Sequence, residues 1–215
     1  MIVNRYRYIE QLSRSKNNGL IKIITGLRRS GKSFLLKKLF HQHLLDEGVR
    51  EDHILVIDME SRKNREFKNP DYLLDWVEKM MIDYETYYII IDEVQEVEDF
   101  VEVLSSLSVT EGADVYVTGS NSRFLSSDLV TEFRGRGDEI HVWPLSFKEF
   151  MTVYDGSKED GWAEYRLYGG LPQLLTQVGD EKKADFLIPD YQRPYAWGEK
   201  ECQTLWDDLF LFAFP

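Results

Sequence analysis

The chain has 215 residues, 43% of them hydrophobic and 30% charged, which is typical of one globular domain or one domain with an appendage. No apolar run reaches the ~18 residues of a membrane span and no apolar signal region begins the chain, so we expect a cytoplasmic protein without a membrane partner. Because Cys202 is the single cysteine, an internal disulfide and a cysteine-based metal cluster are excluded. The net charge of −12 is uneven, with 15 basic against 8 acidic residues up to residue 68 and 11 against 30 beyond it. The basic part suits an anionic ligand, whereas the acidic remainder argues against broad non-specific DNA binding.

The first predicted elements surround a glycine-bearing loop. Apolar spacing predicts a helix over residues 2–12, and the β-branched run at 19–25 predicts a short strand. Residues 26–33 then read GLRRSGKS, which matches the P-loop spacing G-x-x-x-x-G-K-[ST] at every fixed position. A helical pattern follows from residue 34 and is expected to end near Gly48.

Strand, glycine loop and helix form the context that a phosphate-binding loop requires. The two glycines let the backbone wrap closely round a phosphate, and successive N–H groups then face the anion. The spacing places Lys32 at the β- and γ-phosphates and the Ser33 hydroxyl on Mg²⁺. A glycine turn without a ligand is the alternative, which this context disfavours. The predicted nucleotide-binding residues are Gly26, Arg28, Arg29, Ser30, Gly31, Lys32, Ser33 and Phe34.

A second buried strand is predicted over residues 53–58. Asp58 and Glu60 come at its carboxyl end, where open α/β sheets place ligand-binding residues. Residues 62–68 are expected to form an exposed polar loop. The sequence Asn-Pro-Asp at 69–71 then predicts the start of a helix that continues to Met81.

The next apolar run, YYIIIDE at residues 87–93, ends in two acids as a Walker B strand does. A continuous apolar run predicts a strand that is covered on both faces. Asp92 would approach Mg²⁺, and Glu93 would orient or activate the attacking water. An acidic turn after an ordinary strand is the alternative, but the upstream P-loop favours the functional interpretation.

A helix over residues 101–107 and a strand over 114–118 complete the regular elements that the spacing predicts. The sequence GSNS at 119–122 could contact the γ-phosphate or water, and a turn or helix cap explains it equally well. Arg134 and Arg136 follow in a glycine-bearing segment. An arginine there could act as an arginine finger or could form a surface ion pair.

Together these motifs resemble the bacterial and archaeal AAA+-like P-loop ATPases that carry an additional C-terminal domain. The resemblance covers about residues 1–180 and implies binding and hydrolysis of ATP with Mg²⁺, a parallel sheet flanked by helices, Ser120 or Asn121 as the sensor residue, and Arg136 as a trans-acting or sensing arginine. The matching blocks are residues 25–33, 89–95, 117–121, 135–136, 144–150 and 168–172.

The resemblance fades near residues 180–183, and the following sequence is of another kind. DFLIPDYQRPYAWG at 185–198 is similar to the opening of the ParB-like domain of GmrSD-type restriction proteins, which implies Gln192 and Arg193 as site residues. About 30 residues are too few for an independent core, so we expect no nuclease activity from them. Three interpretations of these residues remain. They are the remnant of a gene fusion, they cover an ATPase surface left bare by the missing domain, or they pair with another chain.

The sequence therefore predicts an α/β P-loop NTPase with a mainly parallel sheet flanked by helices and a short helical C-terminal tail. We expect an AAA+-like ATPase domain over residues 1–183 and a truncated ParB-like fragment over 184–215. Glu93, Lys32, Asn121 and Arg136 are the predicted catalytic residues, and Ser33 and Asp92 the predicted metal ligands.

The predicted function is hydrolysis of ATP with Mg²⁺, slow without a partner or oligomer, by a protein whose output domain is missing or replaced. The sequence leaves open whether the protein forms a homo-oligomer or binds a protein partner. It also leaves DNA open as a partner, although the overall charge does not support DNA binding. The alternatives are a nucleotide-gated binding module without significant turnover and a remnant component of a DNA restriction system.

Overall fold

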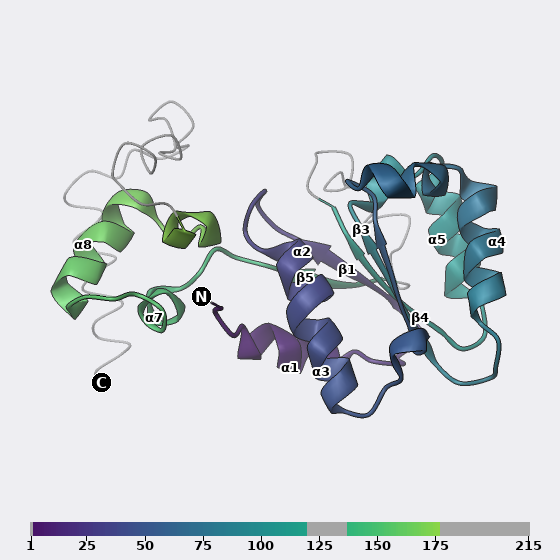
Figure 1. Cartoon of the computed structure of the whole chain (residues 1–215), viewed down its shortest axis with the longest axis horizontal. Coiled ribbons are helices and arrows are strands. Elements are labelled where there is room, and N and C mark those ends of the chain that lie inside the picture. Colours follow the sequence, from purple (N-terminus) through teal and green to yellow (C-terminus); the bar gives the residue numbers. More distant parts are fainter. Residues whose placement is uncertain (1, 120–136, 177–215) are drawn as a thin grey trace. The chain divides into compact units, whose positions relative to one another are not determined.

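A computed structural model describes residues 2–119 and 137–176 of the chain (Figure 1). All of these residues belong to one unit, Met1–Thr176, whereas the second unit, Gln177–Pro215, lies outside the described residues. The predicted C-terminal tail and its residues Gln192 and Arg193 fall in that second unit. The account below therefore concerns the first unit.

Within the described residues, five parallel strands form a sheet in the spatial order β2-β3-β4-β1-β5. This arrangement confirms the predicted α/β fold with a parallel sheet. Because β4 lies between β1 and β3, the P-loop after β1 and the two acids at the end of β3 lie at the same edge of the sheet, on either side of β4. The strands are β1 (Ile21–Thr25), β2 (Ile54–Asp58), β3 (Tyr87–Asp92), β4 (Ala113–Thr118) and β5 (Gly137–His141).

Helices cover both faces of the sheet, as Figure 1 shows. On one face, α4 (Pro70–Met80) and α5 (Phe100–Ser108) pack against alternate strand residues such as Ile89. On the other face, α1 (Tyr6–Arg14) and the helix that follows the P-loop pack against the intervening residues such as Ile90. The interior strand β3, between β2 and β4, is buried along its whole length, which explains its uninterrupted apolar sequence.

The helix that follows the P-loop is continuous but not uniform. It begins as α2 (Lys32–Phe34), passes through a π-helical segment at Leu35–Phe40 and continues as α3 (His41–Asp46). Gly48 has a φ of 90° just beyond its end, in keeping with the predicted cap. π-Helical turns inside α-helices are frequent at functional sites, and this one contains Lys37, whose contacts are described below.

The structure corrects two of the predicted elements. The first helix begins at Tyr6 and not at residue 2, because Arg5 leaves the helical conformation and its side chain binds elsewhere. Residues 62–68, expected as a loop, form two short 3₁₀-helical turns with a kink at Asn64. A hydrogen bond from the Asn64 side-chain amide to the Asp58 carbonyl, at 2.9 Å, ties the kink back to β2. The predicted start of α4 is confirmed, with the Asn69 side chain accepting from the Tyr72 N–H.

After β5 the chain forms α7 (Phe147–Met151), α8 (Lys158–Tyr168) and a 3₁₀-helix at Pro172–Thr176. Ser146 and Glu149 form a capping box at the start of α7. The Tyr165 hydroxyl donates to the Leu145 carbonyl at 2.7 Å, and aromatic rings of α7 and α8 pack together. These contacts hold the two helices and the 144–146 turn as one structure.

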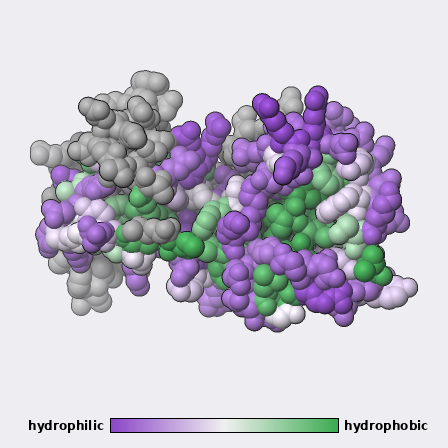
Figure 2. Space-filling view, in the orientation of Figure 1, coloured by the Kyte–Doolittle hydropathy of each residue, from purple (hydrophilic) through white to green (hydrophobic). Residues whose placement is uncertain are grey.

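The described surface is largely hydrophilic in the view of Figure 2, with separate hydrophobic areas between the polar side chains. This distribution matches a core that lies between the sheet and its helices. Within residues 2–119 and 137–176, the helices are too short or too polar to cross a membrane.

Candidate nucleotide site

The loop between β1 and α2 has a backbone that ordinary residues adopt only with strain. Gly26 has a φ of 134°, and a Cβ there would lie 2.2 Å from the Val142 carbonyl oxygen, so the close passage of the segment after β5 requires glycine. Arg29 and Gly31 also have positive φ values, 67° and 97°. A non-glycine residue in this conformation is uncommon and concentrates at ligand-binding loops.

Lys32, the lysine of the P-loop, folds its side chain over its own loop. Its ammonium donates to the carbonyl oxygens of Gly26 and Leu27, at 3.0 Å each. Burial lowers the pKa of Lys32, and the nearby carboxylates of Glu93 and Asp92 oppose that shift. The ammonium therefore lies near two acids, and its hydrogen bonds go to two neutral carbonyl oxygens that an anion could replace.

Asp92, at the end of β3, is fully buried, and both of its carboxylate oxygens have partners. The Thr118 hydroxyl at the end of β4 donates to Oδ1 at 2.6 Å, and the Lys37 ammonium lies 2.6 Å from Oδ2. Lys37 also donates to Asp58, the β2 residue in register with Asp92, at 2.8 Å. Burial alone would lower the pKa of Lys37, but these two carboxylates outweigh it and raise the pKa.

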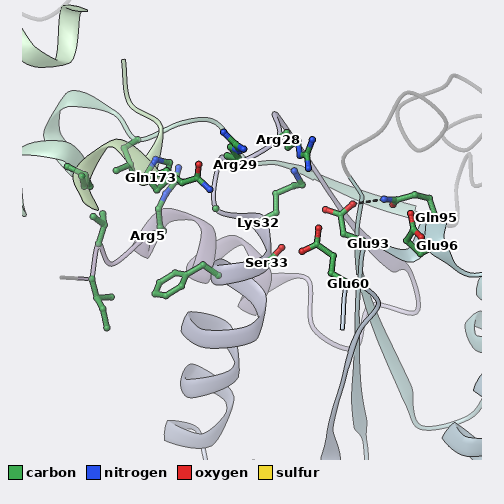
Figure 3. Close-up of a pocket in the computed structure, with 17 residues that line it drawn as sticks. Arg5, Arg28, Arg29, Lys32, Ser33, Glu60, Glu93, Gln95, Glu96 and Gln173 are labelled. Atoms are coloured by element: carbon green, nitrogen blue, oxygen red, sulfur yellow. Dashed lines mark hydrogen bonds between the residues drawn. The ribbon is translucent and has the colours of Figure 1, made fainter. Parts of the chain in front are cut away.

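Glu93 follows directly and leaves the strand conformation. Its φ of 58° and ψ of 54° turn the chain sharply, and its N–H donates to the Thr118 hydroxyl at 2.9 Å. The Gln95 side-chain amide donates to its carboxylate, as the dashed line in Figure 3 marks. Thr118 thus fixes the positions of both acids.

A cavity of about 830 Å³ lies beside the P-loop. Figure 3 shows Lys32, Arg28 and Glu93 directed toward a common space, with Ser33 and Glu60 nearby. Basic loop residues thus face acidic residues across it. The lining side chains and backbone belong to Ile2, Val3, Arg5, Arg28, Arg29, Gly31, Lys32, Ser33, Phe34, Glu60, Glu93, Gln95, Glu96, Leu145, Pro172, Gln173 and Leu175.

Most of the site residues expected from the sequence come together here. Seven of them line the cavity, whereas Gly26, Ser30 and Asp92 are buried and are not among its lining residues. Ser30 is fully buried, and its hydroxyl has no hydrogen-bond partner among the described residues. Ser120, Asn121, Arg134 and Arg136 lie outside the described residues. The seven are Arg28, Arg29, Gly31, Lys32, Ser33, Phe34 and Glu93.

Three polar residues of the site escaped sequence reasoning. Thr118 ends a predicted strand, but its role depends on β4 being the neighbour of β3. Lys37 looks like any helix lysine until β2 and β3 are placed in register. Arg5 lies in the region expected to be the first helix, and its side-chain hydrogen bonds go to residues 25 to 144 positions away.

Residues 18–151 match the family model described as an AAA domain. The chain belongs to this AAA domain family. Its residues 173–214 match a second family model, the N-terminal domain of the GmrSD restriction endonuclease. Both matches confirm the resemblances that the sequence motifs indicated.

Two curated relatives of this AAA domain protein are uncharacterised proteins. It is 35% identical over 193 residues to one from Haemophilus influenzae, covering 87% of this chain and 48% of the relative. It is 25% identical over 187 residues to one from Methanocaldococcus jannaschii, covering 80% of this chain and 40% of the relative. The chain thus spans about half the length of the curated relatives it matches.

Among solved structures, the AAA domain protein is similar to AMPPCP-bound DnaA from Aquifex aeolicus. The TM-score is 0.50 at 15% sequence identity, with 97% of this chain and 67% of that chain covered. At this identity the likeness shows a common fold.

Proposed function

We propose that this AAA domain protein binds ATP together with Mg²⁺ in the cavity beside the P-loop and hydrolyses it. The observation that carries the proposal is the meeting of Lys32 and Glu93 at one cavity, from two strands that are separated by β4. Phosphoryl transfer depends on positioning and on stabilising the charge of the phosphates, and these residue types supply both. The AMPPCP in the similar DnaA structure is in keeping with a nucleotide as ligand.

The P-loop supplies the phosphate-binding groups. Its backbone N–H groups at the start of α2 attract an anion, and the buried Ser30 hydroxyl has a donor to offer to a phosphate oxygen. Lys32 would exchange two neutral carbonyl acceptors for phosphate oxygens. Negative charge at the phosphates favours the protonated form of this lysine, against the effect of burial.

The donors around the loop fit Mg²⁺, which prefers oxygen ligands and keeps several waters. The Ser33 hydroxyl lines the cavity, and Asp92 Oδ2 already faces a cation, the Lys37 ammonium. Ser33 and Asp92 would hold the ion, with the Glu60 carboxylate at the same cavity. When bound, Mg²⁺ supplies neutralisation of the charge that develops on the phosphates.

Glu93 has the position and the chemistry of the residue that orients or activates water. Its carboxylate lines the cavity and is held by Gln95, and its backbone is fixed by Thr118. A carboxylate held in place can accept a hydrogen bond from water and take up its proton as attack proceeds. Asn121 and Arg136 stay predictions as the sensor and the finger, and a missing finger would slow turnover by ~10³ to 10⁵.

Nucleotide binding and turnover by matched variants test the proposal. Lys32→Ala should lose affinity for ATP, because the ammonium at the phosphates is gone. Glu93→Gln should bind ATP with Mg²⁺ and fail to hydrolyse it. Glu96→Gln is the control, since Glu96 lines the same cavity but pairs with Lys68 at its exposed side.

Calorimetry with ATP and a phosphate-release assay give the two readouts. Wild-type protein that neither binds nor hydrolyses ATP would overturn the proposal. If Glu96→Gln abolished turnover and Glu93→Gln did not, the assignment of the acids would be wrong.

A further inference from the structure

Arg5 joins three parts of the chain that are far apart in sequence. Its Nη1 donates to the Ser30 carbonyl at 3.2 Å, its Nη2 to the Trp143 carbonyl at 2.8 Å, and its Nε to Glu149 Oε1 at 3.0 Å. The guanidinium also lies 4.5 Å from the centre of the Tyr8 ring. Only 6% of Arg5 is exposed. A buried arginine with this many partners is fixed in one position.

The contact with Ser30 falls within the P-loop itself. The Ser30 carbonyl and the Gly31 N–H belong to one planar, trans peptide unit, so they point in opposite directions. Arg5 therefore sets the direction of the Gly31 N–H by holding the carbonyl on the other side of the peptide. Gly31 lines the cavity and has a left-handed φ of 97°, a conformation in which the peptide could otherwise rotate.

The contact with Glu149 extends the connection to α7. One carboxylate oxygen of Glu149 pairs with Arg5, and the other accepts from the N–H and hydroxyl of Ser146 at the start of α7. Leu145, next to this cap, lines the cavity. The same guanidinium thus reaches the phosphate-binding loop and the segment that closes the cavity on another side.

We propose that Arg5 is a positioning residue of the phosphate site, which orients the Ser30–Gly31 peptide toward a bound phosphate and anchors it to Trp143 and α7. The inference rests on the proposed function, because it assumes that the loop binds phosphate. A planar guanidinium presents its donors in a fixed fork, and three of them reach these three acceptors. A lysine keeps the charge but not the geometry.

Titrations with two probes test this role. Inorganic tripolyphosphate reports on the phosphate cradle alone, and ADP reports on the cradle together with the base contacts. Arg5→Met should weaken both by about tenfold or more, because a charge-assisted hydrogen bond no longer orders the peptide. Equal losses for the two probes locate the effect at the phosphates. The protein is kept well below the unfolding midpoint of each variant.

Arg14→Met is the matched control. Arg14 lies on the same helix, α1, and forms an exposed pair with Glu10, so its removal takes the same charge away and should change both affinities by less than about twofold. Glu149→Gln keeps the capping box and the hydrogen bond from Arg5 to Ser30, so its affinity for the two probes should fall less than that of Arg5→Met. Arg5→Lys should bind more tightly than Arg5→Met and more weakly than wild type.

The outcomes separate this inference from the proposed function. If wild-type protein binds neither probe, the proposed function fails. If wild type binds both probes and Arg5→Met matches Arg14→Met, the positioning role alone is wrong. Should Arg5→Met not fold, Arg5→Lys decides: affinity below that of Arg14→Met supports the role, and equal affinity overturns it.

Discussion

Thr118 donates a hydrogen bond from its hydroxyl to Oδ1 of Asp92 at 2.6 Å, at the ends of two neighbouring strands. The same hydroxyl accepts from the Glu93 N–H at 2.9 Å. Thr118 is fully buried, so water does not replace either bond. One side chain thus determines the orientation of the buried acid and the backbone of the acid that lines the cavity.

Replacing Thr118 with Val should lower both stability and activity. The variant leaves the Glu93 N–H without its acceptor and Oδ1 of Asp92 without its donor, so we expect a loss of ~1–3 kcal/mol in the free energy of unfolding. If Asp92 holds the metal ion as we propose, we also expect ~10 to 100-fold slower ATP hydrolysis, because Thr118 orients that ligand. Urea unfolding and steady-state turnover give the two numbers.

Thr118→Ser is the control, because it keeps the hydroxyl and removes only a methyl group. It should retain turnover near that of wild type. A Val variant as active as the Ser variant would show that the hydroxyl does not support the site.

Lys37 lies between Asp58 and Asp92, and its removal should make the protein depend more strongly on Mg²⁺. Lys37→Met leaves two neighbouring carboxylates without their shared cation, which should lower the free energy of unfolding by ~2 kcal/mol, between the values for exposed and buried pairs. Added Mg²⁺ should stabilise this variant more than wild type, because a divalent ion then meets uncompensated charge. Unfolding with and without Mg²⁺ measures the difference.

Lys38→Met serves as the comparison, since Lys38 is the exposed neighbour on the same helix. It should behave like wild type in both conditions. Equal responses of the two variants to Mg²⁺ would argue against a role for Lys37 at the acids.

Lys22 and Asp114 form a buried ion pair between β1 and β4, and we expect it to affect stability but not the site. Asp114 also accepts from the Tyr116 hydroxyl at 2.8 Å, and burial together with this carboxylate raises the pKa of Tyr116, so that hydroxyl stays protonated. Lys22→Met leaves the Asp114 carboxylate without a cation and should lower the free energy of unfolding by ~3–5 kcal/mol.

The double variant Lys22→Met/Asp114→Asn should recover much of that loss, because the amide oxygen still accepts from Tyr116 and no buried charge remains. ADP affinity measured on the folded variants should equal that of wild type. A Lys22→Met variant as stable as wild type would contradict this account of the pair.

The parts of the site that depend on local spacing were predictable from the sequence. The P-loop and the acids that end β3 are marked by fixed intervals, and the start of α4 by its Asn69 cap. The short strand β5 was not predicted, because its sequence GDEIH has little apolar alternation and it forms by pairing with β1. Such a strand is specified by its neighbour and not by its own residues.

The contacts of Arg5, Lys37 and Thr118 were not predictable for a related reason. Each depends on which elements the sheet order brings together, and a single sequence contains no direct signal for that order. The first helix was placed too early for the same reason. Its apolar spacing extends to residue 2. In the structure Arg5 has a non-helical backbone and makes tertiary contacts, and the helix begins at Tyr6.

Single-turnover hydrolysis of γ-labelled ATP, with protein in excess and Mg²⁺ present, tests the central claim most directly. It needs no estimate of product release, and it compares wild type with Glu93→Gln at full occupancy of the site. In quenched samples we expect wild type to have formed labelled phosphate and Glu93→Gln to retain intact ATP, with hydrolysis slower by ~10² or more. Release of phosphate by Glu93→Gln at the wild-type rate would contradict the claim.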